Sequence, residues 1–288
     1  MSPPPEPVQR AGNPGFLRLS AYLERRIGIE LGADRAYLAQ SRLGAVLTSF
    51  GLRDLDGLVL ALERQPTPAL QDAVIDAMTT HETQWFRDQY PFDVLSNRVL
   101  PERWRPASPL RLWSAACSTG QEAYSLAITL DECRQRQAGL RGASYEILGT
   151  DVSPGALRMA AEGIFDAQNG VRGLSPTRLE RYFERQRGGY LLRPAWRRAV
   201  SFQLFNLLDD PRGCGVFDVI FLRNVLIYFS AAAQHRLLER VASCLAPAGY
   251  LILGTAETLA SQHSTLIPRR LDGGVIYQRQ PVHRAPGT

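Results

Sequence analysis

The first part of the chain has apolar residues spaced three and four positions apart. This spacing indicates amphipathic helices, because one turn takes 3.6 residues and the apolar side chains then share a face. The pattern breaks at Gly32, at Gly51 and at Pro66-Thr67-Pro68, which are typical helix ends. It therefore predicts a small helical domain, whose apolar positions include Phe16, Leu19, Leu23, Ile27, Leu43, Val46, Leu47, Phe50, Leu55, Leu58, Val59, Leu62, Leu70, Val74, Ile75 and Met78.

The second part of the chain alternates between short apolar runs and helical stretches. The runs are rich in β-branched and aromatic residues, and their alternation with helices is typical of a parallel sheet covered on both faces. We expect strands at residues 111–116, 145–150, 199–205, 217–222 and 250–254, and helices at 90–100, 122–137, 154–162 and 232–245. The fold class is therefore α/β.

One segment, residues 175–198, departs from this alternation. It contains seven arginines, and Gly188-Gly189 separates Tyr182-Phe183 from a second apolar run. A glycine pair in that place predicts a small hairpin outside the main sheet. The arginines are consistent with an ordinary solvated surface and equally with a segment that binds a partner.

Composition narrows the class of protein. The 288 residues have a net charge of +5, and all 33 basic residues are arginine, which suits an acidic partner. Residues 1–15 are proline-rich and have no signal-peptide core, so we expect a disordered tail. The apolar run at 216–229 is too short and too polar to insert into a membrane. The four cysteines have neither zinc-site nor disulfide-framework spacing. We expect a cytoplasmic enzyme without a metal.

The most informative motif is residues 112–125 (LWSAACSTGQEAYS), where an apolar strand turns through small residues into a helix. Gly120 relieves the tight turn, and the helix start offers free N–H groups to an anion. Asp151 ends the next expected strand, 31 residues later, where doubly wound folds hold ribose hydroxyls. The patterns GxGxxG and GxxxxGK[ST] are absent, which disfavours NAD and ATP. An adenosyl ligand without a polyphosphate, S-adenosylmethionine, fits better.

Other polar residues follow later strands, and ligands of open α/β sheets bind beyond the carboxyl ends of the strands. Asn206 can bond an adenine edge while Leu207 packs on its face, and Arg223 and Asn224 follow the next strand. A buried Arg-Asn pair needs hydrogen-bond partners. Either a ligand supplies them, or the pair is a helix cap plus a structural arginine. The linker segment at residues 79–88 (TTHETQWFRD) is, on its own, consistent with a capping box.

Taken together, these motifs resemble the CheR-type chemoreceptor glutamate O-methyltransferases. The resemblance covers residues 16–279 and depends on THET-x-WFR at 80–87, SAACSTGQE at 114–122, Asp151, NLL at 206–208 and RNVLIYF at 223–229. It implies a class I methyltransferase domain with a Rossmann-like, mostly parallel sheet, an N-terminal all-α domain and a small β-subdomain at about 182–202. The expected boundaries are 16–88 for the helical domain with the linker motif and 89–288 for the methyltransferase domain.

The resemblance also implies the site residues and the reaction. It assigns cofactor contacts to His81, Thr83, Arg87, Glu122, Asp151, Asn206, Leu207, Arg223 and Asn224. Asp151 is expected on the ribose and Glu122 near the methionyl end, Tyr228 lies beside the substrate, and Arg103 faces the active site by ungapped spacing. The enzyme, a monomer, then converts S-adenosylmethionine to S-adenosylhomocysteine and methylates glutamates in the cytoplasmic helical region of chemoreceptors.

The sequence departs from the family at several positions. His81 stands where asparagine is usual, so its contact is expected to depend on pH. Gln121 replaces a common glutamate and Ala123 a common proline. The second helix of the helical domain offers Arg42 alone, which argues against the usual receptor surface. The short insert argues against docking on a receptor's C-terminal tether.

The residues alone leave other functions open. A Ser-His-Asp or Cys-His set is missing, which suits methyl transfer to an ionised glutamate, since no general base is needed. The positive charge also suits a class I methyltransferase acting on RNA or another acceptor. Sparse aromatic residues and the missing amine-binding motif N-P-P-Y argue against it, so we expect no nucleic-acid partner. A third interpretation is a catalytically silent, cofactor-sensing adaptor.

Overall fold

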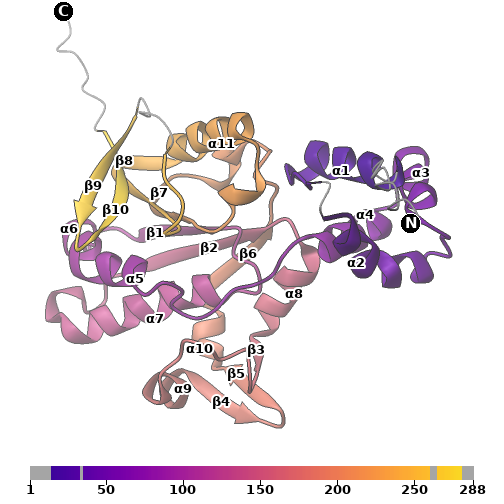
Figure 1. The fold of residues 1–288 in the computed structure, drawn as a ribbon. Helices are drawn as coiled ribbons and strands as arrows, with labels where there is room; N and C mark the ends of the chain where they lie inside the picture. Colours follow the sequence, from indigo (N-terminus) through magenta and orange to yellow (C-terminus); the bar gives the residue numbers. More distant parts are fainter. Residues whose placement is uncertain (1–13, 33–34, 260–264, 281–288) are drawn as a thin grey trace, which may run out of the picture. The chain divides into compact units, whose positions relative to one another are not determined.

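The computed structural model describes residues 14–32, 35–259 and 265–280. The chain forms two compact units that divide between Thr79 and Thr80 (Figure 1). The linker motif at residues 80–88 is therefore part of the second unit. Of the expected N-terminal tail, residues 1–13 lie outside the described residues, whereas Pro14 and Gly15 already belong to a helix.

In its described residues, the first unit consists of α1 (Pro14–Ile27), α2 (Ala36–Ser49), α3 (Leu55–Arg64) and α4 (Pro68–Met78). Asp54 and Thr67 cap α3 and α4, since their side-chain oxygens accept hydrogen bonds from backbone N–H groups at 2.8 and 3.2 Å. α1 packs against α3, and α2 against α4. Most apolar positions expected from the sequence fill the interface, among them the fully buried Leu19, Leu23, Leu43, Leu58, Val59 and Val74. Leu47 is only half-buried, and Phe50, just after α2, is exposed. The predicted all-α domain is confirmed.

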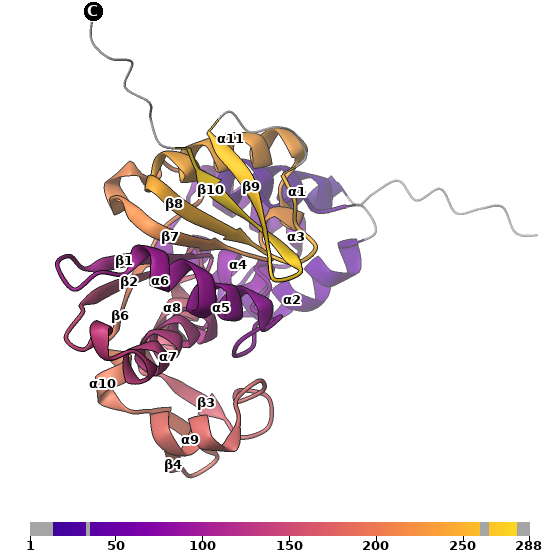
Figure 2. The same cartoon turned by 90° about the vertical axis from the view of Figure 1, so that its left-hand side faces the viewer.

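The second unit is built on a seven-stranded sheet in the order β6-β2-β1-β7-β8-β10-β9 (Figures 1 and 2). The strands are β1 (Leu110–Ala115), β2 (Tyr145–Asp151), β6 (Val200–Leu204), β7 (Phe217–Leu222), β8 (Leu245–Leu253), β9 (Leu266–Leu271) and β10 (Gly274–Arg279). From β6 to β8 neighbouring strands are parallel, whereas β10 and β9 are antiparallel. The predicted mostly parallel sheet is confirmed.

Helices cover both faces of this sheet. Alternate residues of a strand point to opposite faces, so Leu112 packs in the apolar cluster with α7 (Gln121–Arg136) and Trp113 in the cluster with α11 (Ala231–Ser243). The α7 face also holds α5 (Tyr90–Val94), the π-helical turn η2 (Leu95–Val99) and α6 (Leu100–Arg103) (Figure 2). α8 (Pro154–Glu162) packs beside β2 and β6. Short 3₁₀ turns are η3 (Ala138–Leu140), η4 (Pro211–Cys214) and η5 (Leu226–Tyr228).

The hairpin of β9 and β10 is a feature that the sequence analysis missed. Asp272 and Gly273 form its turn with φ of 46° and 89°, the left-handed conformation that Asp-Gly favours in tight hairpins. The hairpin places β9 at one end of the sheet. The outermost strand therefore carries the exposed residues Pro268, Arg269 and Arg270.

The insert forms a separate three-stranded sheet in the order β3-β5-β4. It consists of β3 (Ile164–Asp166), α9 (Pro176–Tyr182), β4 (Phe183–Gln186), β5 (Gly189–Leu192) and α10 (Pro194–Arg197). The predicted hairpin at Gly188 is confirmed, with φ of 84° at that glycine. The insert differs from the expected range of 182–202 at both ends. It begins earlier, at β3, and it ends before Val200, because β6 belongs to the main sheet.

The arginines of the insert serve different purposes. Arg178 donates two hydrogen bonds to Glu132, at 2.8 and 2.9 Å, and lies 3.7 Å from the ring centre of Phe86. Arg193 pairs with Glu184. Arg185 and Arg187, at the tip of the hairpin, are exposed. Part of the arginine-rich pattern thus stabilises the fold, and part faces solvent.

Candidate functional site

The loop after β1 is shaped to let a ligand approach its backbone. Ala116 and Ser118 have positive φ values of 60° and 52°, and Gly120, at 92°, is the last residue before α7. A Cβ on Gly120 would come within 2.9 Å of the Cβ of Ala160, so a larger residue would push α8 away. Strained backbone of this kind often marks a binding site.

Asp151 joins this loop to the end of β2. It is 8% exposed, and its two carboxylate oxygens accept hydrogen bonds from the backbone N–H groups of Ser118, at 2.8 Å, and Ser153, at 2.9 Å. Burial raises the pKa of Asp151, while the backbone hydrogen bonds oppose that rise. A carboxylate has about four lone-pair sites, and these hydrogen bonds do not use all of them, which leaves room for a ligand's hydroxyl group.

The segment 80–89, which we call the strap, runs across the same edge of the sheet. The hydroxyl of Ser118 donates to the carbonyl of His81 at 3.3 Å, and the hydroxyl of Ser125, on α7, accepts from the N–H of Phe86 at 3.1 Å. His81, Thr83 and Arg87 are half-buried along it. Fixed at both points, the strap holds these predicted contact residues beside the loop after β1.

Trp85 fastens the strap to the insert. Its indole N–H donates to the carbonyl of Gly170 at 2.8 Å, and its ring lies 4.9 Å from that of Phe165 and 5.2 Å from that of Phe183. The side chain is 1% exposed. The aromatic residue of the linker motif is therefore a packing residue.

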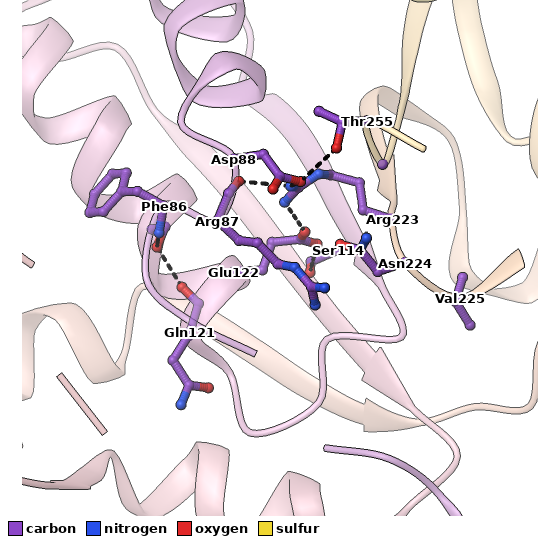
Figure 3. A network of polar contacts seen from close by, with 12 residues as sticks. Phe86, Arg87, Asp88, Ser114, Gln121, Glu122, Arg223, Asn224, Val225 and Thr255 are labelled. Carbon is purple, nitrogen blue, oxygen red and sulfur yellow. Dashed lines mark hydrogen bonds and ion pairs between the residues drawn. The ribbon is translucent and has the colours of Figure 1, made fainter. Parts of the chain in front are cut away.

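Arg223, which follows β7, lies at the centre of a buried charge network (Figure 3). Its guanidinium donates to Glu122 at 2.8 Å, to Asp88 at 2.8 Å and to the carbonyl of Arg87 at 2.7 Å. The side chain is 1% exposed, and its Nε is buried without a hydrogen-bond partner. Arg223 thus ties the strap to the sheet.

Glu122, in the first turn of α7, is positioned by two partners. Arg223 donates to its Oε2, and the fully buried Ser114 of β1 donates to its Oε1 at 2.7 Å. Both oxygens retain a lone pair, and the side chain is 13% exposed. The arrangement fits a fixed acceptor for the amino group of a methionyl ligand.

The remaining predicted residues lie at the ends of β6 and β7. Asn206 is half-buried, and its Oδ1 accepts from the N–H of Leu208 at 3.0 Å, while Leu207 is 8% exposed. Asn224 has a positive φ of 56°, and Tyr228 closes η5, with its N–H donating to Val225 at 3.2 Å. The structure therefore brings ten of the eleven predicted residues to the carboxyl edge or the strap, namely His81, Thr83, Arg87, Glu122, Asp151, Asn206, Leu207, Arg223, Asn224 and Tyr228.

Arg103 is the exception. Its guanidinium donates to Asp218 at 2.6 Å and to the carbonyl of Pro247 at 3.1 Å. Asp218 is near the amino end of β7, and Pro247 near that of β8. Because parallel strands share a direction, Arg103 lies at the opposite end of the sheet from Asp151 and Arg223. It does not face the active site.

Asp88 and Glu257 are polar residues of this edge that the sequence analysis missed. Asp88 accepts from Arg223 and, at 3.3 Å, from the hydroxyl of Thr255. Glu257, which follows β8, accepts hydrogen bonds from the backbone of the loop after β7. An acid shortly after the last parallel strand was the available signal, because that strand also ends at this edge.

The donor set fits S-adenosylmethionine. Asp151 has free lone pairs for ribose hydroxyls, Glu122 has them for a methionyl ammonium, and Asn206 offers an amide to an adenine edge. Across residues 14–32, 35–259 and 265–280, no group of three or more His, Cys, Asp or Glu could hold a metal ion. Among the same residues no helix is long and apolar enough to cross a membrane.

Comparisons with known proteins find the same relatives for both units. Residues 81–272 match the family described as "CheR methyltransferase, SAM binding domain", and residues 14–79 match "CheR methyltransferase, all-alpha domain". The chain is 43% identical over 270 residues to "Chemotaxis protein methyltransferase Cher2" of Pseudomonas putida, covering 93% of this chain and 98% of that protein. It is 42% identical over 271 residues to "Chemotaxis protein methyltransferase 1" of Pseudomonas aeruginosa, with coverage of 93% and 98%. "Probable biofilm formation methyltransferase WspC" of Pseudomonas putida is 31% identical over 273 residues, covering 93% of this chain and 62% of that protein.

Proposed function

The chain belongs to the CheR methyltransferase family, and from this premise we propose that it methylates glutamate side chains of a chemoreceptor. The chain is a chemotaxis methyltransferase that depends on S-adenosylmethionine. Methyl transfer yields a glutamate methyl ester and S-adenosylhomocysteine.

The observation that carries the proposal is the composition of the carboxyl edge. The acids Asp151, Glu122 and Asp88 of this edge hold the backbone or the buried Arg223, which leaves them unsuited to take a proton from an acceptor. A glutamate acceptor, whose side chain ordinarily has a pKa of about 4.3, is ionised at neutral pH and attacks without a base. An amine or an alcohol needs a proton acceptor. A carboxylate is thus the acceptor that this site suits best.

The cofactor supplies an electrophilic methyl group on a sulfonium, and the protein supplies alignment. We assign Asp151 to the ribose, Glu122 to the methionyl ammonium, and Asn206 and Leu207 to the adenine. Holding donor and acceptor in line and excluding water is worth about 7–11 kcal/mol in favourable intramolecular reactions. This positioning effect is the main contribution that the chain's residues make to the rate.

Arg87 is the arginine that we assign to the incoming carboxylate. Arg223 is buried and donates to Glu122, Asp88 and the carbonyl of Arg87, and Arg103 is at the other end of the sheet. The guanidinium of Arg87 is half-buried and donates to the carbonyl of Glu82 at 3.1 Å, which leaves further N–H groups for a ligand. Tyr228, also half-buried, is assigned to the same substrate. An arginine that binds from one side orients the carboxylate and leaves one oxygen free to attack.

We further propose that the protein acts as a monomer in the cytoplasm, on the acidic helical region of its receptor, and without a nucleic-acid partner. Arg42, in the helix that resembles the usual receptor-binding helix, donates to the carbonyls of Met78 and Thr79, both at 3.4 Å. It is therefore occupied at the end of α4. The acidic receptor would have to be met by other arginines of the chain.

The test is to incubate the protein with methyl-labelled S-adenosylmethionine and membranes from its own cell. We expect label on a receptor-sized protein, released as methanol in mild base, because carboxyl methyl esters hydrolyse there. Label that survives base would indicate methylation of nitrogen, in protein or RNA, and would contradict the proposal. Cofactor binding without any turnover would favour a silent adaptor.

A further inference from the structure

Glu257 is a buried acid that belongs to none of the motifs described above. It lies four residues after the end of β8 and is 8% exposed. Its Oε2 accepts from the N–H groups of Asn224, at 2.7 Å, and Gly254, at 2.9 Å. Its Oε1 accepts from those of Val225, at 3.0 Å, and Leu226, at 2.9 Å. One carboxylate thus satisfies four backbone donors.

Three of these donors come from the loop that carries the predicted site residues. Asn224, Val225 and Leu226 lead into η5, and the first N–H groups of such a turn have no partner within it. The carboxylate acts as a cap supplied from more than 30 residues downstream. It also stabilises the positive φ of 56° at Asn224, a conformation that needs outside support in a non-glycine residue.

Gly254 makes room for this contact. A Cβ at that position would lie 2.7 Å from Oε2 of Glu257 and 3.0 Å from Nδ2 of Asn224. These distances are shorter than van der Waals contact, so any larger residue would displace the carboxylate, the amide or both. The glycine, the acid and the loop therefore form one fitted unit.

We propose that Glu257 is a positioning residue of the methyltransferase site. In this assignment it contacts neither the methyl donor nor the methyl acceptor. It acts by fixing Asn224 and Tyr228 at the carboxyl end of β7. A glutamine in its place has one oxygen and turns an amide N–H₂ toward the remaining donors, so the loop loses its fixed conformation. The proposal rests on the cofactor site at this edge and not on the identity of the acceptor.

The experiment measures the affinity for S-adenosylhomocysteine by calorimetry, and the melting temperature, for Glu257→Gln. The matched control is Glu102→Gln. Glu102 is a carboxylate on α6 that accepts from the hydroxyl of Tyr250 at 2.8 Å, and Tyr250 lies in β8 of the same sheet. Gly254→Ala perturbs the same loop while keeping the acid, and it decides the question if Glu257→Gln does not fold.

We expect Glu257→Gln and Gly254→Ala each to weaken binding by about tenfold or more, because a displacement of about 1 Å at a site is costly. Glu102→Gln should bind within about twofold of wild type even if it melts earlier. In an Asn224→Ala background the effect of Glu257→Gln should shrink to about twofold, since the two residues act through one loop.

Wild-type affinity in both Glu257→Gln and Gly254→Ala would overturn the proposal, and so would an equal loss in Glu102→Gln or undiminished loss in the Asn224→Ala background. These readouts need no acceptor. A wild-type protein that binds the cofactor product but methylates no receptor glutamate contradicts the proposed acceptor and leaves the assignment of Glu257 standing.

Discussion

The two ends of the central sheet hold their charged residues in different ways. At the carboxyl ends, Asp151 and Glu257 accept from backbone N–H groups, and Arg223 is 1% exposed between two acids. At the amino ends, Arg103 and Asp218 are 20% and 21% exposed, and the pair of Arg111 and Glu146 is open to water. The side chains of Asp151, Glu257 and Arg223 are buried at the proposed ligand edge, whereas these two ion pairs at the amino ends stay partly hydrated.

Backbone strain differs in the same direction. Positive φ values occur at Ala116, Ser118 and Asn224, directly after β1 and β7, and at Phe86 and Asp88 of the strap. At the amino end Ala248 has such a conformation, in the irregular start of β8. Each strained residue costs of the order of 1–3 kcal/mol. At Ser118 and Asn224, hydrogen bonds to the carboxylates of Asp151 and Glu257 help to offset this cost. Charged residues thus stabilise the fold at the amino ends of the strands, whereas at the carboxyl ends they hold the loops of the proposed site in a fixed conformation.

The largest effect is expected for Asp151→Ala. The change removes the carboxylate assigned to the ribose and unties the loop after β1 from β2. Two charge-assisted hydrogen bonds of about 1.5–3 kcal/mol each correspond to a loss of S-adenosylhomocysteine affinity of about 100-fold or more. Calorimetry measures it. Asp166→Ala is the control, because that exposed aspartate at the end of β3 also accepts backbone hydrogen bonds. Equal affinity in the two variants would contradict the ribose assignment.

The second effect is that of Arg223→Met. It leaves the mostly buried carboxylate of Glu122 and the more exposed carboxylate of Asp88 without their cation, at a cost of about 3 kcal/mol to stability. In a unit of this size that lowers the melting temperature by about 6–12 °C. We also expect cofactor affinity to fall by about tenfold, since Glu122 and the strap lose their support. Calorimetry measures both the melting temperature and the cofactor affinity. A stable variant with normal affinity would show that the charge network does not support the cofactor site.

A smaller effect is expected from pH. The ionised form of Asp151 accepts the ribose hydroxyls, and burial raises its pKa above 3.8, the value for an ordinary aspartate. As the pH falls, affinity for S-adenosylhomocysteine should therefore decline at a higher pH than an exposed aspartate would cause, and should recover as the pH rises. In Asp151→Asn, binding is weaker and this decline is missing. If Asp151→Asn still loses affinity as the pH falls, another titrating group is responsible for the decline.

The smallest effect is that of Arg103→Met. Its ion pair with Asp218 is partly hydrated, so we expect a loss of about 1 kcal/mol or less in stability. Cofactor affinity and turnover should stay within about twofold of wild type, because the pair lies at the far end of the sheet. Urea unfolding and a methylation assay measure the two. A large loss of turnover in a normally folded variant would contradict the placement of Arg103 away from the active site.

Ligands of open α/β sheets bind at the carboxyl ends of the strands, and this explains how much of the site could be predicted. Asp151, Arg223 and Asn224 are far apart in the sequence, yet the carboxyl ends of parallel strands meet at one edge, so their position after a strand was enough. Arg103 precedes β1 in a helix, and ungapped spacing does not say at which end of the sheet a helical residue lies. Its misplacement has that cause.

The partners of Asp88 and Glu257 could not be predicted, because they follow no residue pattern. Glu257 binds main-chain N–H groups, which any sequence provides, and Asp88 pairs with Arg223 across 135 residues. The hairpin of β9 and β10 was different. Asp272-Gly273 between two apolar runs is a recognised hairpin signal, so this part of the fold was readable and was overlooked.

The outer rim of the sheet has one last consequence. Pro268 offers no N–H to a neighbour, and Arg269 and Arg270 place two like charges on the same outermost strand. An extended polypeptide approaching this rim meets a gap in the hydrogen-bond ladder and a repelling, well-hydrated surface. The central sheet is thereby protected against lengthening by a passing chain, and with it against fibril growth from that side.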